Sequence, residues 1–166
     1  MRIVTIENKK DEKFLRRKTR PFDFARYTPK EIRELVKTMR EAMREADGIG
    51  LSANQIGLDV AVFVARVENK FYALFNPKIV KISEEADELH EGCLSVPHKV
   101  GVVPRPSRLT LEGKDQRGKP IKIKAWGLLA RVFQHETDHL NGILFANKAK
   151  RMEALSDIGN QSDNQN

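Results

Sequence analysis

Residues 134–139 read QHETDH and form the most specific chemical pattern in the chain. His135 and His139 are four residues apart, so on a helix both imidazoles lie on one side and can bind the same cation. Glu136 lies beside them, where its carboxylate can reach a water on that cation without binding the cation. The pattern is the HExxH of metallohydrolases. Its alternative is a helix whose two histidines have ordinary hydrogen-bond partners.

The helix that must carry this pattern is predicted over residues 127–140. Leu128 and Val132 lie on the same stripe as the two histidines. We therefore expect the histidines to continue an apolar, buried face of that helix. Buried histidines need polar partners, and a metal ion is one such partner.

A catalytic zinc site of the common type has three protein ligands and one open position. The residues after His139 contain no histidine, so the third ligand is expected upstream. Cys93, within EGCLS at residues 91–95, is the candidate because it is the only cysteine of the chain. Two other interpretations stay open for this thiol: an inert core residue and a catalytic nucleophile.

Residues 48–55 read GIGLSANQ and follow the first predicted helix. The segment lacks the Gly-Lys-Ser/Thr ending of a phosphate-binding loop. Gly50 has no side chain, so another backbone can approach it closely. Gln55 can present its amide to a developing oxyanion. A glycine that ends a helix and is followed by a turn explains the segment equally well.

Together and in this order, GIGLSANQ, EGCLS and QHETDH resemble the three signature motifs of peptide deformylases, GxGxAAxQ, EGCLS and QHExDH. The similarity extends less sharply from Leu15 to Phe145. The resemblance implies an α+β fold, with antiparallel and mixed β-sheets packed around a central HExxH helix. It also implies the activity, which is removal of the N-formyl group from the initiator methionine of nascent polypeptides with release of formate.

The resemblance also implies residue roles. The implied ligands of one divalent cation are Cys93, His135 and His139, with water in the fourth position. Glu136 would carry a proton from that water to the departing amine, and the side-chain amide of Gln55 and the backbone N–H of Leu94 would stabilise the oxyanion. Relatives commonly work with ferrous iron, and zinc, nickel or cobalt would also fit the site in preparations.

The N-formylmethionyl peptide would bind as an added strand that pairs with backbone near Ile49, Gly50 and Gly92. The residues implied for the methionine pocket are Ile49, Leu128 and Val132. Arg105 matches an arginine that contacts the substrate in relatives; its other interpretation is a plain surface charge.

Ser52 stands where the motif usually has alanine, and we expect the small serine to be tolerated.

Two rival functions remain. A zincin-like endopeptidase needs a third ligand after the helix, and a non-catalytic binder of nascent chains or ribosomes predicts the loss of a catalytic position. None of the catalytic positions is lost, since the chain has all five of them: Gln55, Cys93, His135, Glu136 and His139.

The other elements are predicted from periodicity and turn residues, and strands in the middle with helices at both ends indicate an α+β domain. Thr28 and Glu31 form a capping box that opens a helix at Pro29. The remaining predictions are an extended arm over 1–27, hairpin strands at 60–67 and 71–80, a charged loop at 83–89, irregular strands within 93–111 and a second hairpin at 109–113 and 121–126.

Length and composition bound these interpretations. The 166 residues, 40% hydrophobic and 32% charged, predict one catalytic domain over 1–155 and a disordered polar tail over 156–166. No run approaches the roughly 20 apolar residues of a membrane span, so we expect a cytoplasmic protein without a membrane partner. The net charge of +7 is spread along the chain and argues against sequence-specific nucleic-acid binding. Two explanations stay open for the basic residues Lys148, Lys150 and Arg151: they dock on ribosomal RNA, or they are solvent-exposed charges at the end of a helix.

Overall fold

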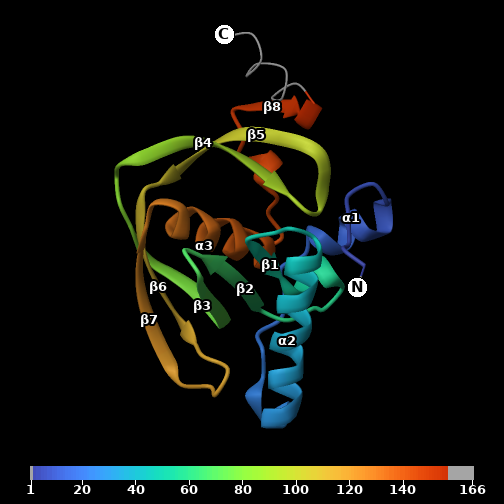
Figure 1. Ribbon diagram of the computed structural model, residues 1–166, viewed down its shortest axis with the longest axis vertical. Coiled ribbons are helices and arrows are strands. Elements are labelled where there is room, and N and C mark those ends of the chain that lie inside the picture. The colour runs from blue at the N-terminus through green and yellow to red at the C-terminus, as the bar shows by residue number, and fades with distance from the viewer. Residues whose placement is uncertain (1, 157–166) are drawn as a thin grey trace.

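The computed structural model describes residues 2–156 and arranges them as two antiparallel β-sheets around helix α3 (Gly127–Leu140) (Figure 1). This helix has the predicted bounds and contacts strands of both sheets. The predicted α+β fold with a central HExxH helix is therefore confirmed. Within residues 2–156, no helix is long and apolar enough to cross a membrane.

The larger sheet has the strand order β1-β2-β3-β6-β7, and the smaller sheet has the order β4-β5-β8. The strands are β1 (Gly50–Ser52), β2 (Val62–Val67), β3 (Lys70–Ile82), β4 (Ala86–Cys93), β5 (Val96–Pro106), β6 (Arg108–Lys114), β7 (Pro120–Trp126) and β8 (Arg151–Ala154). The other helices are α1 (Lys9–Leu15) and α2 (Pro29–Glu45), with single 3₁₀ turns at Phe24–Arg26, Ala53–Ile56 and Phe145–Asn147.

Strand β2 is buried on both faces because a helix covers each side of the larger sheet. Val62 and Val64 pack in the core under α2, whereas Phe63 and Ala65 pack in the core under α3. This division follows from the two-residue period of a strand. One face of the larger sheet thus packs against α3 and positions the histidines that this helix carries.

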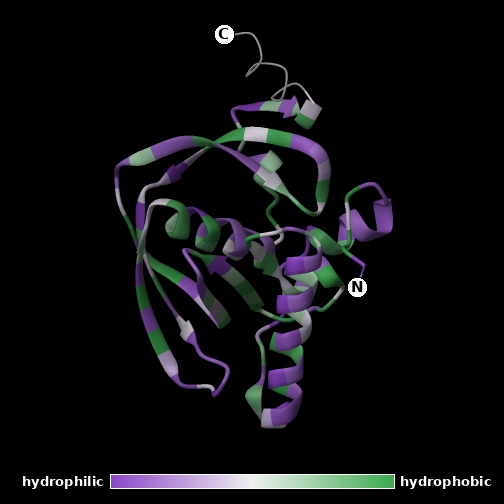
Figure 2. Cartoon of the chain, in the orientation of Figure 1, coloured by the Kyte–Doolittle hydropathy of each residue, from purple (hydrophilic) through white to green (hydrophobic). Residues whose placement is uncertain are grey.

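Local signals explain where the elements begin and turn. The predicted capping box is present at α2, with Thr28 N donating to Glu31 Oε2 over 2.7 Å. Glu68 and Asn69 both have positive φ, 49° and 63°, as a tight hairpin turn with right-handed strand twist requires. Hydrophilic and hydrophobic residues alternate along β6 and β7 (Figure 2). β2 pairs with β3, and β6 pairs with β7, both in antiparallel register, so both predicted hairpins are present.

Two expectations for the chain outside the motifs are wrong, and one strand was not predicted. The arm over 1–27 contains α1, which Asn8 caps through its side-chain oxygen and which buries Leu15. The charged segment 83–89 runs into β4, an edge strand, where charged side chains remain in solvent. Strand β8 was not expected, and it pairs with Lys99–Val102 of β5. Its four residues show no period of their own, so only the partner strand defines it.

The predicted disordered tail lies outside the described residues except for Ser156. The assignment of residues 1–155 to one catalytic domain stays a prediction.

Candidate active site

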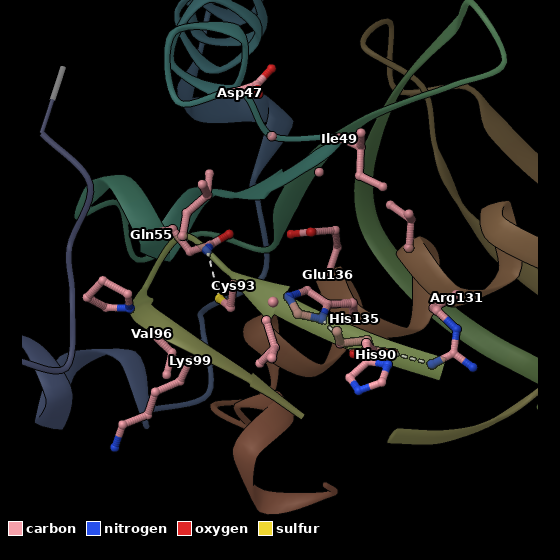
Figure 3. A pocket seen from close by; sticks show the side chains of 18 of the residues that line it. Asp47, Ile49, Gln55, His90, Cys93, Val96, Lys99, Arg131, His135 and Glu136 are labelled. Carbon is pink, nitrogen blue, oxygen red and sulfur yellow. Dashed lines mark hydrogen bonds and ion pairs between the residues drawn. The ribbon is translucent and has the colours of Figure 1, made fainter. Parts of the chain in front are cut away.

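The side chains of Cys93, His135 and His139 come together in one cluster, and Figure 3 shows two of them, Cys93 and His135, close to Gln55 and Glu136. Cys93 ends β4, and both histidines lie on α3. Sγ of Cys93 is 3.1 Å from Nε2 of His139, which is 3.2 Å from Nε2 of His135. The three donor atoms lie within 4.8 Å of one another. They thus face one common point between the smaller sheet and α3.

The chemistry of these donors fits a divalent cation. Burial raises the pKa of the Cys93 thiol, but the neighbouring His139 and His135 imidazoles outweigh burial and hold this pKa well below its ordinary value. The Cys93 thiol therefore loses its proton more readily than an ordinary thiol. Nδ1 of His135 is 2.9 Å from Oε2 of Glu91, and this contact turns Nε2 toward the cluster. A thiolate with two imidazoles suits zinc or ferrous iron.

Glu136 is buried beside the cluster and lies against β1. Burial raises the pKa of its carboxyl group, and the nearby His135 and His139 oppose that effect. Oε2 of Glu136 accepts a hydrogen bond of 2.8 Å from the Ser52 hydroxyl. A Cβ on Gly50 would lie 2.2 Å from Oε1 of Glu136. Gly50 therefore leaves room for this carboxylate, a role that the sequence pattern did not reveal.

Gln55 reaches the cluster from the 3₁₀ turn that follows β1. Its Oε1 accepts from the Ser52 backbone N–H at 2.9 Å, which fixes the orientation of the amide. Its Nε2 donates to Ser95 Oγ at 3.1 Å and lies 3.6 Å from Cys93 Sγ. The amide donor is thus aimed at the cluster, beside the short loop that holds Leu94.

A cleft of about 410 Å³ opens over these groups. The other residues with predicted roles that line it are Ile49, Gly50, Gly92, Leu94, Leu128 and Val132. Ile49 and Leu128 are each about half exposed at its edge, whereas Val132 is buried. The expectation that Leu128 continues the buried stripe of α3 is therefore wrong. The helix begins at Gly127, so its first turn projects into the open cleft.

Arg105 does not line the cleft, and neither predicted interpretation of it is correct. Its side chain is 2% exposed. Its guanidinium donates twice to Glu91, at 2.6 and 2.8 Å, and once to Asp138 at 2.7 Å. Arg105 is therefore a buried ion-pair residue that joins β5 to β4 and α3.

Three residues near the centre had no role in the sequence analysis. Glu91 holds His135, and its position within EGCLS was the available signal. Arg131 lines the cleft and donates to Glu91 Oε1 at 2.6 Å and to the Val103 carbonyl at 2.9 Å. Ser52 was noticed only as a departure from the usual motif.

Comparison with known proteins identifies this arrangement. The family profile described as polypeptide deformylase matches residues 1–154. The chain belongs to the polypeptide deformylase family. Deformylases are metal-dependent enzymes that remove the formyl group from the N-terminal methionine of nascent polypeptides. The family and the activity implied by the three motifs are thus confirmed.

Individual deformylases match over most of their length. The peptide deformylase of Chloroflexus aurantiacus is 36% identical, and the alignment covers 99% of this chain and 95% of that protein. The peptide deformylase of Treponema pallidum is 46% identical over 71% of this chain and 73% of its own. The crystal structure of the Thermotoga maritima deformylase superposes with a TM-score of 0.82 at 32% identity, covering 90% of this chain and 97% of that one.

Proposed function

We propose that Cys93, His135 and His139 hold one ferrous ion and that Glu136, Gln55 and Leu94 act on the formyl group. The observation that carries this proposal is that the donor cluster lies beside the Glu136 carboxylate and the Gln55 amide, at a cleft lined by four of these residues: Gln55, Cys93, His135 and Glu136. Zinc, nickel or cobalt would fit the same ligands. When bound, such a cation polarises a carbonyl oxygen and makes water more acidic.

The protein groups then divide the reaction between them. Glu136 takes a proton from the attacking water, and the water oxygen bonds to the formyl carbon. The formyl oxygen becomes an oxyanion, which accepts hydrogen bonds from Gln55 Nε2 and the Leu94 backbone N–H. Glu136 then gives its proton to the methionine nitrogen as the C–N bond breaks. The products are formate and a peptide with a free amine.

The peptide would lie as an added strand along the cleft. β1 and β4 are each an edge strand, so their outer backbone groups can pair with a peptide. Gly50 and Gly92 lie on these two strands and line the cleft. The methionine side chain would contact Ile49, Leu128 and Val132, which form the apolar part of the wall.

Formate release from formyl-Met-Ala-Ser tests these roles, with the protein loaded anaerobically with ferrous iron and, separately, with nickel. Glu136→Gln should keep the metal and lower kcat by roughly two to four orders of magnitude, the usual range for a general base. Glu112→Gln is the matched control, because Glu112 lies on β6 and pairs with Lys122 in solvent.

Activity of Glu136→Gln within about twofold of the wild type would exclude Glu136 as the general base. Cleavage of internal peptide bonds without formate release would favour the endopeptidase interpretation. Full metal occupancy without any turnover would favour a non-catalytic binder.

A cytoplasmic location and docking on the ribosome at Lys148, Lys150 and Arg151 are separate proposals. In the structure Lys148 pairs with Asp138 at 2.7 Å, Lys150 with Glu88 and Arg151 with Glu153. Ribosomal RNA would have to replace these pairs. The test is co-sedimentation with ribosomes: replacing all three residues with alanine should abolish it, and unchanged co-sedimentation would reject the docking surface.

A further inference from the structure

Ser52 and Gly50 lie two residues apart on β1 and face the same side, toward Glu136 of α3. The Ser52 hydroxyl is 2.8 Å from Glu136 Oε2, and the Gly50 backbone lies against Glu136 Oε1. Leu51, between them, packs in the core under α2 instead. The two-residue period of the strand therefore presents one hydroxyl and one empty position to the same carboxylate.

This arrangement makes the two carboxylate oxygens of Glu136 different. Oε2 accepts a hydrogen bond from Ser52, whereas Oε1 lies over Gly50, which lines the cleft. Ser52 is fully buried and Glu136 is 3% exposed. Hydrogen bonds to a charged acceptor are stronger than neutral ones, and at this burial bulk water does not readily replace a lost partner. The hydroxyl thus fixes the rotation of the carboxylate.

Ser52 also reaches the second reacting group, but through its backbone. Its N–H donates to Gln55 Oε1 at 2.9 Å, and this bond orients the amide toward Cys93. Any residue at position 52 except proline keeps that bond. Alanine, the usual residue of the family motif at this position, would therefore remove only the contact to Glu136.

We propose that the Ser52 hydroxyl is a positioning group that directs Oε1 of Glu136 toward the reacting water and so raises kcat above that of an alanine-containing site. The proposal rests on the role of Glu136 given under Proposed function. It assigns to this chain a hydrogen bond that the usual alanine of the motif cannot form.

A purely structural role is the competing explanation. The Ser52 hydroxyl also lies 2.9 Å from the backbone carbonyl oxygen of Glu136, so its one proton is shared between two acceptors of the same residue. A bond to the carbonyl alone would join β1 to α3 and affect stability. A bond to the carboxylate affects the rate of the chemical step. The two roles predict different changes in kcat, KM and melting temperature.

The experiment compares metal-loaded wild-type protein with Ser52→Ala in formate release from formyl-Met-Ala-Ser. Positioning predicts that kcat falls about three- to tenfold, less than the roughly 10²-fold that a grossly misplaced group costs. KM should stay within about twofold, because binding of the ground state is unchanged. Metal content should remain one equivalent. Ser52→Thr keeps the hydroxyl and should recover most of kcat.

Thr137→Val is the matched control for loss of a buried hydroxyl next to Glu136 in the sequence. Among residues 2–156 the Thr137 hydroxyl has no hydrogen-bond partner, and Thr137 does not line the cleft. This variant should keep wild-type kcat and KM. A loss of kcat equal to that of Ser52→Ala would mean that any change at this depth perturbs α3, and it would overturn the proposal.

Other results are equally decisive. Wild-type kcat in Ser52→Ala, or a loss carried only by KM or by melting temperature, overturns the positioning role. If Ser52→Thr does not fold, the division between kcat and KM in Ser52→Ala decides alone. Glu136→Gln distinguishes failure of the proposed function from failure of the Ser52 proposal. If Glu136→Gln stays active, the proposed role of Glu136 is wrong. If Glu136→Gln is inactive and Ser52→Ala keeps wild-type kcat, only the proposal for Ser52 is wrong.

Discussion

At the scale of single residues, Gly50 shows how a missing side chain can serve catalysis. Sequence reasoning attributed this glycine to close approach by a peptide backbone. The structure adds a second reason, since a Cβ would lie 2.2 Å from Oε1 of Glu136. Such a contact is far below any van der Waals separation, and Ser52 holds the other carboxylate oxygen, Oε2.

We predict that Gly50→Ala lowers kcat by about 10²-fold, because the carboxylate must leave the position in which it reaches the water. Metal content should stay at one equivalent, since the three ligands are untouched. Glu112→Gln is the control, because Glu112 lies on β6 and pairs with Lys122 in solvent. Unchanged kcat in Gly50→Ala would show that Glu136 can move without loss.

Cys93 separates metal binding from catalysis. We predict that Cys93→Ala binds less than one equivalent of metal after gel filtration, because two imidazoles remain where three donors converge. The measurement is metal content by elemental analysis beside that of Glu136→Gln, which should retain its metal. Full occupancy in Cys93→Ala would reject Cys93 as a ligand and leave the nucleophile interpretation to be tested.

The limits of sequence reasoning are also visible at single residues. The sequence alone predicted that the two histidines and Glu136 lie together, because their spacing on one helix is a local property. Arg105 could not be placed, since its burial depends on Glu91 and Asp138, which lie on two other elements. Ser52 looked neutral for the same reason: its partner is far away in the sequence and close only after folding.

At the scale of elements, one carboxylate ties β4, β5 and α3 together. Glu91 on β4 accepts from Arg105 on β5 and contacts both Arg131 and His135 on α3. Removing one partner of a buried ion pair leaves the others uncompensated, which typically costs 3–5 kcal/mol. The local sequence pattern of α3 predicted the bounds of the helix correctly. The ion pairs that attach α3 to the smaller sheet could not be predicted, because hydrophobic periodicity carries no information about them.

Glu91 makes stability depend on pH. Burial raises the pKa of its carboxyl group, but hydrogen bonds and charge from Arg105 and His135 outweigh burial and hold it at about 2, below the ordinary 4.5. The unfolded chain therefore binds the proton first as pH falls. Stability should be fully present above about pH 4.5 and decline as pH falls toward 2, by roughly 3 kcal/mol in all.

Urea unfolding of metal-free protein between pH 6 and 2.5 measures this linkage without the contribution of metal loss. Glu91→Gln should be less stable at pH 6 and should lose less stability on acidification. If Glu91→Gln does not fold, the slope for the wild type alone decides. A flat stability profile for the wild type down to pH 2.5 would contradict the low pKa of Glu91.

At the scale of the whole molecule, α3 contacts strands of both sheets. Sequence analysis found the α+β class, the helix that carries the histidines and both hairpins because each has a local signal, such as the turn residues Glu68 and Asn69 between two strand-like segments. It missed α1, the start of β4 and all of β8. Those segments are short and mostly polar, so their residues show no period that could be recognised, and β8 is defined only by its pairing with β5.

The proposed cation would join these layers, because Cys93 belongs to the smaller sheet and both histidines belong to a helix packed on the larger one. A ligand that binds only the folded protein and is present at 100 times its dissociation constant adds about 2.7 kcal/mol of stability. For a chain of this size that amount corresponds to roughly 5–10 °C in melting temperature.

We predict that the melting temperature falls by this amount when a chelator removes the metal under anaerobic conditions. Cys93→Ala should start near the lower temperature and should not respond to the chelator. A chelator effect of the same size in that variant would place the stabilising metal elsewhere on the protein.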